Sequence, residues 1–140
     1  MNTPRNQETL ARALRKAGLR PTRQRLSLAQ CLFANGDRHV TAEALYAEAV
    51  AAGYPVSLAT VYNTLHQFTG AGLLRQVMVD TNRSYFDSNT SDHHHYFHEE
   101  TGELVDIPSH AVTVGDLPNM PEGAEVSRVE VVVRVHQRAS

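Results

Sequence analysis

The stretch SLATVYNTL, residues 57–65, decides the fold of this 140-residue chain. Its apolar side chains continue downstream at helical spacing and form a stripe made of Leu58, Val61, Leu65 and Phe68. Ser57 precedes the stripe, and serine is a residue type whose side chain caps the first turn of a helix. The pattern therefore predicts a helix that begins after Ser57 and buries one face.

The opposite face of this predicted helix carries small and hydrogen-bonding side chains and no charge. On a 3.6-residue wheel Ala59, Asn63 and His66 point away from the stripe, with Thr60 and Tyr62 on the flanks. A face that is merely solvated usually carries Lys and Glu. A face that approaches base edges in a DNA groove favours small residues, amides and hydroxyls.

Upstream of this helix, the sequence predicts three more helices. The first covers about residues 7–18, and Thr22 and Thr41 are the expected caps of the second and third. Downstream, residues 73–79 and 83–87 read as two strands joined by a turn. Helices followed by a hairpin are typical of a winged helix-turn-helix, and the alternative is a small helical protein–protein module.

Charge is distributed unevenly along the chain. Residues 1–83 contain ten Lys or Arg and five Asp or Glu, whereas residues 84–140 contain three and ten, which gives +5 and −7. A basic half suits a polyanion such as DNA, because neutralised phosphates release their counterions. An acidic half that is rich in histidine suits cations.

A histidine triplet at residues 93–95 is the densest chemical signal in the acidic half. In a strand, alternate side chains share a face, so His93 and His95 could hold one ion while His94 faces the other way. Asp106 is expected to return on an antiparallel partner strand. The alternative is a surface histidine run with unrelated acidic residues.

The composition of the chain predicts its cellular compartment and its oligomeric state. The one cysteine, Cys31, excludes an internal disulfide and a multi-cysteine zinc site, and we expect it to be a small core residue. No apolar run approaches the ~18 residues of a membrane span, and the first residues lack a secretion-signal pattern. We therefore expect a cytoplasmic protein with no membrane contact. Two small domains would be thinly stabilised alone, so we expect a homodimer.

Four motifs resemble the Fur (ferric uptake regulator) family, namely residues 18–25 (GLRPTRQR), 39–43 (HVTAE), 57–65 and 72–74. The resemblance covers nearly the whole chain in order. It implies an α+β fold, with a winged helix-turn-helix DNA-binding domain at residues 1–87 and a small α/β dimerisation domain built on an antiparallel sheet at residues 88–140. It also implies a repressor that binds double-stranded DNA at an AT-rich palindromic operator.

The resemblance assigns roles to individual residues. The helix after Ser57 would enter the major groove, Tyr62 would pack on thymine methyls, and Arg20 would enter the minor groove. The implied DNA-binding residues are Arg20, Arg23, Arg25, Ser57, Thr60, Tyr62 and Asn63. The implied metal ligands are His39, Asp87, His93, His95 and Asp106. Three imidazoles and two carboxylates suit Mn²⁺, Fe²⁺ or Zn²⁺.

Departures from the family pattern resemble its iron response regulator (Irr) branch. Residues 98–101 and 136–139 stand where many Fur proteins have two Cys-x-x-Cys pairs that hold a structural zinc, so we expect that four-cysteine zinc to be absent. Arg128 occupies a position of a second metal site where a histidine is often found. The branch is associated with iron and haem status. The resemblance therefore implies haem contact at His93, His94 and His95.

Three other functions remain open at this point. The protein could be a Fur-like, metal-activated repressor that is insensitive to haem. It could be a metalloenzyme, although five protein ligands leave little room for a substrate. It could also be a store for iron or haem, which would not explain the uncharged face of the helix after Ser57.

Overall fold

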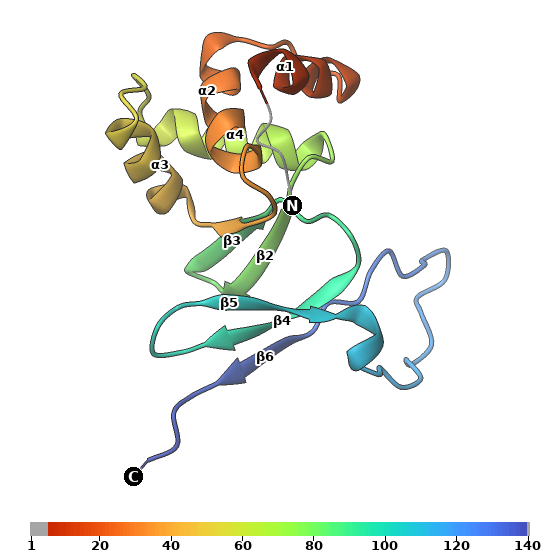
Figure 1. The fold of residues 1–140 in the computed structure, drawn as a ribbon. Helices are drawn as coiled ribbons and strands as arrows, with labels where there is room; N and C mark the ends of the chain where they lie inside the picture. The colour runs from red at the N-terminus through yellow and green to blue at the C-terminus, as the bar shows by residue number, and fades with distance from the viewer. Residues whose placement is uncertain (1–5, 140) are drawn as a thin grey trace. The chain divides into compact units, whose positions relative to one another are not determined.

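The computed structural model describes residues 6–139, and the chain divides into two compact units, Met1–Thr90 and Ser91–Ser140. The first unit contains α1 (Gln7–Lys16), α2 (Arg23–Phe33), β1 (His39–Val40), α3 (Ala42–Ala51), α4 (Leu58–Gly70), β2 (Arg75–Asp80) and β3 (Arg83–Asp87). The second contains β4 (His93–His98), β5 (Leu104–Pro108), the 3-10 turn η1 (Ser109–Ala111) and β6 (Val132–Val135) (Figure 1). The α+β class is confirmed.

Polar side chains cap the start of each of the four α-helices. Asn6, Thr22, Thr41 and Ser57 accept hydrogen bonds from the N–H groups of Thr9, Arg25, Ala44 and Thr60, respectively. Each bond satisfies one of the backbone donors that a helix start leaves without an intrahelical partner. The caps predicted at Thr22, Thr41 and Ser57 are confirmed, and Asn6 is an additional one.

We expect Thr41→Ala to lower the free energy of unfolding by about 1 kcal/mol, because the variant loses the cap of α3. The bond that is lost joins the Ala44 N–H to Thr41 Oγ1 at 3.1 Å. Urea denaturation followed by circular dichroism measures the change. Thr113→Ala is the matched control, because Thr113 is exposed in an irregular segment. Equal stabilities of the two variants would contradict the assigned cap.

The apolar faces of α1, α2, α3 and α4 pack into one core in the first unit. Val61, Leu65 and Phe68 on α4 are fully buried, as the helical stripe predicted. The prediction for Leu58 is wrong: this residue is 37% exposed, because it is the first residue of α4. Cys31 is half-buried and packs against the core, and burial raises the pKa of its thiol.

A three-stranded antiparallel sheet in the order β1-β3-β2 completes the first unit. The hairpin of β2 and β3 corresponds to the predicted pair of strands. Its turn is closed by Asp80, which accepts from the Asn82 N–H and from the Arg83 guanidinium. Two-residue β1 was not predicted, because it is too short to show an alternating pattern. Its pairing places His39 opposite Asp87.

The sheet of the second unit is mixed, with the order β5-β4-β6. β4 and β5 are antiparallel, as expected, but β4 and β6 are parallel, which corrects the expected all-antiparallel sheet. The physical reason is the long connection before β6, since a parallel pair needs a crossover of about a dozen residues or more. Among the residues described in this unit, the helical element is the 3-10 turn η1.

Across residues 6–139 no helix combines the length and the apolar character that a membrane crossing requires.

Candidate metal centre and nucleic-acid interface

In the first unit, His39 and Asp87 form a close pair. They are cross-strand partners on β1 and β3, and Nε2 of the imidazole lies 3.2 Å from Oδ2 of the carboxylate. The Asp87 side chain is 1% exposed, and its other oxygen accepts from the Asn89 N–H at 2.9 Å. A carboxylate this deeply buried requires hydrogen-bond donors or a cation. The His39 imidazole and the Asp87 carboxylate are therefore candidate metal ligands.

The residues next to this pair attach it to the helices. The backbone N–H of Arg38 donates to Ser88 Oγ at 2.8 Å, and the backbone N–H of Ser88 donates to the Arg38 carbonyl at 3.1 Å. The Arg38 guanidinium makes a bidentate pair with Glu48 on α3 and donates to the carbonyl of Cys31 on α2. The hydrogen bond to Glu48 raises the pKa of Arg38 further above its usual range. His39 is thus held in a fixed position relative to α2 and α3.

In the second unit, His93, His95 and Asp106 form another cluster. His95 and Asp106 are cross-strand partners on β4 and β5, and the rings of His93 and His95 lie 4.6 Å apart. Their Nε2 atoms are 3.3 and 3.4 Å from the same Oδ1 of Asp106. The strand alternation correctly predicted that the two histidines share a face. The structure brings both imidazoles onto one carboxylate oxygen.

A backbone contact selects one tautomer of the His93 ring. Nδ1 of His93 lies 2.6 Å from the carbonyl oxygen of Ser91. A carbonyl can only accept, so Nδ1 carries the proton, and in the neutral ring Nε2 presents a lone pair to Asp106. A lone pair and a carboxylate oxygen at this distance repel unless a cation, a proton or a metal ion, lies between them. Donation to a carbonyl by the second ring nitrogen is typical of metal-binding histidines.

His94 faces away from this cluster. It is buried, and its Nδ1 accepts from the Val131 N–H at 3.0 Å, just before β6. This bond connects β4 to the segment that leads into β6. Because His94 lies on the opposite face of the strand from His93 and His95, one planar ligand on one face meets at most two of the three imidazoles. The haem contact expected at His93, His94 and His95 stays a prediction.

The side chains predicted to read DNA lie on the exposed face of α4 or at its start. Tyr62 and Asn63 are exposed, whereas Thr60 is half-buried. Ser57 Oγ accepts the Thr60 N–H and lies 3.0 Å from Thr60 Oγ1, so both hydroxyls take part in the cap. The side chains of this face that project into solvent are therefore those of Tyr62, Asn63 and His66, together with the small side chain of Ala59.

Tyr62 has a partner that the sequence did not indicate. Its hydroxyl donates to Oε1 of Glu43, in the first turn of α3, at 2.5 Å. This hydrogen bond lowers the pKa of Glu43 and raises the pKa of Tyr62. Glu43 belongs to the motif at residues 39–43, but no sequence pattern assigns it a role, because the contact joins residues that are 19 positions apart.

The three predicted DNA-binding arginines differ in their surroundings. Arg20 and Arg23 are exposed. Arg25 donates to Gln67 on α4 at 3.1 and 3.4 Å and to the carbonyl of Arg20 at 2.9 Å. Arg25 therefore links the start of α2 to α4. Gln67 was not predicted, since a single glutamine on a helix carries no sequence signal.

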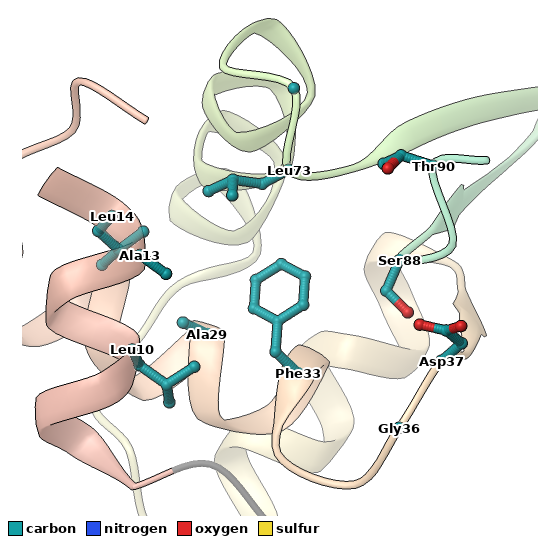
Figure 2. Close-up of a pocket in the computed structure, with 11 residues that line it drawn as sticks. Leu10, Ala13, Leu14, Ala29, Phe33, Gly36, Asp37, Leu73, Ser88 and Thr90 are labelled. Carbon is teal, nitrogen blue, oxygen red and sulfur yellow. The ribbon is translucent and has the colours of Figure 1, made fainter. Parts of the chain in front are cut away.

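A cavity of about 420 Å³ lies elsewhere in the first unit, among α1, α2 and the segments around Leu73 and Ser88 (Figure 2). Leu10, Leu14 and Phe33 contribute apolar side chains, and among the described residues that line it only Asp37 is ionisable. These lining residues include none of the predicted site residues.

Known proteins resemble this chain in sequence and in fold. Residues 16–133 match the sequence pattern described as the Ferric uptake regulator family. The chain is 40% identical over 95 residues to a Ferric uptake regulation protein of Pseudomonas aeruginosa, which covers 67% of this chain and 71% of that protein. It is 36% identical over 102 residues to the Peroxide-responsive repressor PerR of Staphylococcus aureus (strain Mu50), covering 72% of this chain and 67% of that protein.

A solved structure is similar as well. The ferric uptake regulator from Pseudomonas aeruginosa, determined with manganese, superimposes with a TM-score of 0.71. The two chains are 29% identical, and the alignment covers 93% of this chain and 98% of that one.

Proposed function

Because the chain belongs to the ferric uptake regulator family, whose members are dimeric DNA-binding transcription regulators and not enzymes, we propose that it represses iron-responsive genes from an AT-rich palindromic operator. The exposed, uncharged face of α4 supports entry of this helix into the major groove. The exposed side chains of Arg20 and Arg23 supply positive charge for the phosphates. A cytoplasmic location follows from this proposal.

The proposed effector is a divalent metal ion that takes ligands from His39, Asp87, His93, His95 and Asp106. The observation that carries this proposal is the convergence of two imidazoles on one carboxylate, since Nε2 of His93 and Nε2 of His95 lie 3.3 and 3.4 Å from the same Oδ1 of Asp106. The donors are nitrogen and oxygen, which suits Mn²⁺, Fe²⁺ or Zn²⁺. An ion held by ligands from both units would restrict their relative motion, and DNA affinity would thereby be linked to metal binding.

A finer proposal concerns haem. The histidine triplet and the missing cysteine pairs support membership of the Irr branch, in which haem would be a second effector. Because His94 lies on the other face of β4, His93 and His95 are the better candidates for axial ligands. The alternative is a Fur-like repressor that responds to metal and is insensitive to haem.

The proposed function is tested by fluorescence anisotropy with an AT-rich palindromic duplex and a scrambled duplex of equal composition. The protein is measured metal-free, loaded with Mn²⁺, and loaded with haem. We expect Mn²⁺ to change the Kd for the palindrome by roughly 5- to 150-fold, the usual range of coupling between two sites. We also expect affinity to fall steeply between 50 and 200 mM salt, by about 10³-fold or more if six phosphates are contacted.

Each arm of this experiment has a distinct meaning. A flat salt response with equal affinity for both duplexes would contradict a sequence-specific regulator. Release of the palindrome by haem would support the Irr branch. Indifference to haem, with a response to Mn²⁺, would support the Fur-like alternative.

A further inference from the structure

The contact between Tyr62 and Glu43 has a consequence for base recognition. We propose that Glu43 is a positioning residue that engages the hydroxyl proton of Tyr62 and thereby makes α4 select against guanine at one base pair of each half-site. This inference rests on the proposed function, because it concerns the DNA that α4 reads. It adds a specificity-determining residue outside the predicted DNA-binding set.

The geometry gives the phenol one defined hydrogen-bond partner. Tyr62 is 38% exposed on α4, and its hydroxyl lies 2.5 Å from the carboxylate of Glu43, which is itself exposed on α3. Both side chains line a cavity of about 290 Å³, whose other ionisable side chains are His66 and Arg83. The tyrosine ring is thereby held in place beside open space, and its position is set from α3 as well as from α4.

The chemistry of the hydroxyl group determines what it can read. A phenol has one proton to donate, and here that proton is directed at Glu43, so the Tyr62 oxygen can only accept. In the major groove guanine presents acceptors alone, N7 and O6, whereas adenine has an amino donor beside its N7, cytosine presents an amino donor, and thymine has a methyl group beside its O4. An acceptor-only oxygen is repelled by guanine. It is compatible with an amino group, and the ring is compatible with a thymine methyl.

Both groups keep the required protonation state around neutral pH. The hydrogen bond raises the pKa of Tyr62, so the phenol keeps its proton to higher pH than usual. The same bond lowers the pKa of Glu43, so the carboxylate stays ionised to lower pH than usual.

Glu43 could also act simply through its charge. A carboxylate close to phosphates repels every duplex equally, so its removal would tighten binding without any change in base preference. The two effects separate in a matched series. Glu43→Gln removes the charge and keeps an oxygen that accepts from Tyr62. Glu43→Asp keeps the charge and shortens the side chain by one methylene, which breaks the contact.

The experiment uses the Mn²⁺-loaded full chain. The wild-type protein selects a duplex from a randomised library, and each base pair of that duplex is then replaced by G·C and by C·G. Anisotropy gives the Kd of every duplex for wild type, for Glu43→Ala, Glu43→Asp and Glu43→Gln, for Tyr62→Phe and for the Glu43→Ala/Tyr62→Phe double variant. Thermal melting confirms that each variant is folded.

We expect Glu43→Ala and Glu43→Asp to reduce the discrimination against guanine at one position of each half-site by about tenfold, within the usual value of a base contact. Glu43→Gln should keep the wild-type discrimination. In the Tyr62→Phe background, Glu43→Ala should have no further effect on discrimination, because the phenol through which it acts is gone.

Two outcomes would overturn the inference. One is a uniform gain of affinity in Glu43→Ala and Glu43→Gln, with unchanged discrimination in all variants, which would reduce Glu43 to a charge effect. The other is a loss of discrimination in Glu43→Ala that persists in the Tyr62→Phe background. If the wild-type protein selects no duplex at all, the proposed function fails and this inference fails with it, which is a different and recognisable result.

Discussion

Replacing His95 by alanine is expected to lower the affinity of the protein for Mn²⁺ by at least about 100-fold. Loss of a residue that hydrogen-bonds a metal ligand lowers the affinity for the metal by about 10- to 100-fold. Loss of a ligand itself should lower it by at least as much. Nε2 of His95 lies 3.4 Å from Oδ1 of Asp106, at the oxygen that His93 also approaches. Isothermal titration of the metal-free protein with Mn²⁺ measures the effect, and the response of DNA affinity to Mn²⁺ should disappear with it.

Controls separate metal binding from folding. The His95 side chain is 2% exposed, so alanine also leaves a cavity, and His95→Gln is a second variant that fills more of the space. His110→Ala is the matched control, because His110 is an exposed histidine on η1 in the same unit. Unchanged Mn²⁺ affinity in a folded His95→Ala or His95→Gln protein would place the metal site elsewhere.

Phe68→Ala should lower the free energy of unfolding by about 3–5 kcal/mol, the usual range for truncation of a buried phenylalanine. Phe68 is fully buried on α4, and its ring centroid lies 6.1 Å from that of Phe33 on α2. Total stabilities are only about 5–15 kcal/mol, so the variant should lose a large share of its folded population and of its DNA binding. Urea denaturation, followed by circular dichroism, measures the loss.

Leu58→Ala on the same helix is the control for this effect. Leu58 is 37% exposed, so we expect its truncation to cost under about 1 kcal/mol. A similar cost for Phe68→Ala and Leu58→Ala would mean that the apolar face of α4 does not hold the first unit together.

Local patterns in the sequence predicted most of the first unit. Thr22, Thr41 and Ser57 cap their helices because capping involves residues only three positions apart. β1 and the parallel position of β6 could not be predicted in this way. Both depend on partners far along the chain, such as Asp87 for His39 and His95 for Val132.

In the candidate sites, too, arrangements of neighbouring residues were predicted and contacts between residues far apart in the sequence were not. Strand alternation placed His93 and His95 together, because neighbouring side chains of a strand point to opposite faces. The bond from Val131 to His94, the bidentate pair of Arg38 with Glu48 and the contact of Tyr62 with Glu43 were not predicted. These contacts connect residues that are 37, 10 and 19 positions apart, and no periodicity in the sequence reports them.

The parallel pairing of β4 with β6 also fixes the order in which the protein can mature during synthesis. Val132 of β6 pairs with His95 of β4, and a long connection separates β6 from β5. Nascent chains fold their N-terminal domains first. The helices α1 to α4 therefore leave the ribosome well before β4 receives its second neighbour. The sheet of the first unit can form early in synthesis, whereas the sheet of the second unit is completed only when Val132–Val135 has been made.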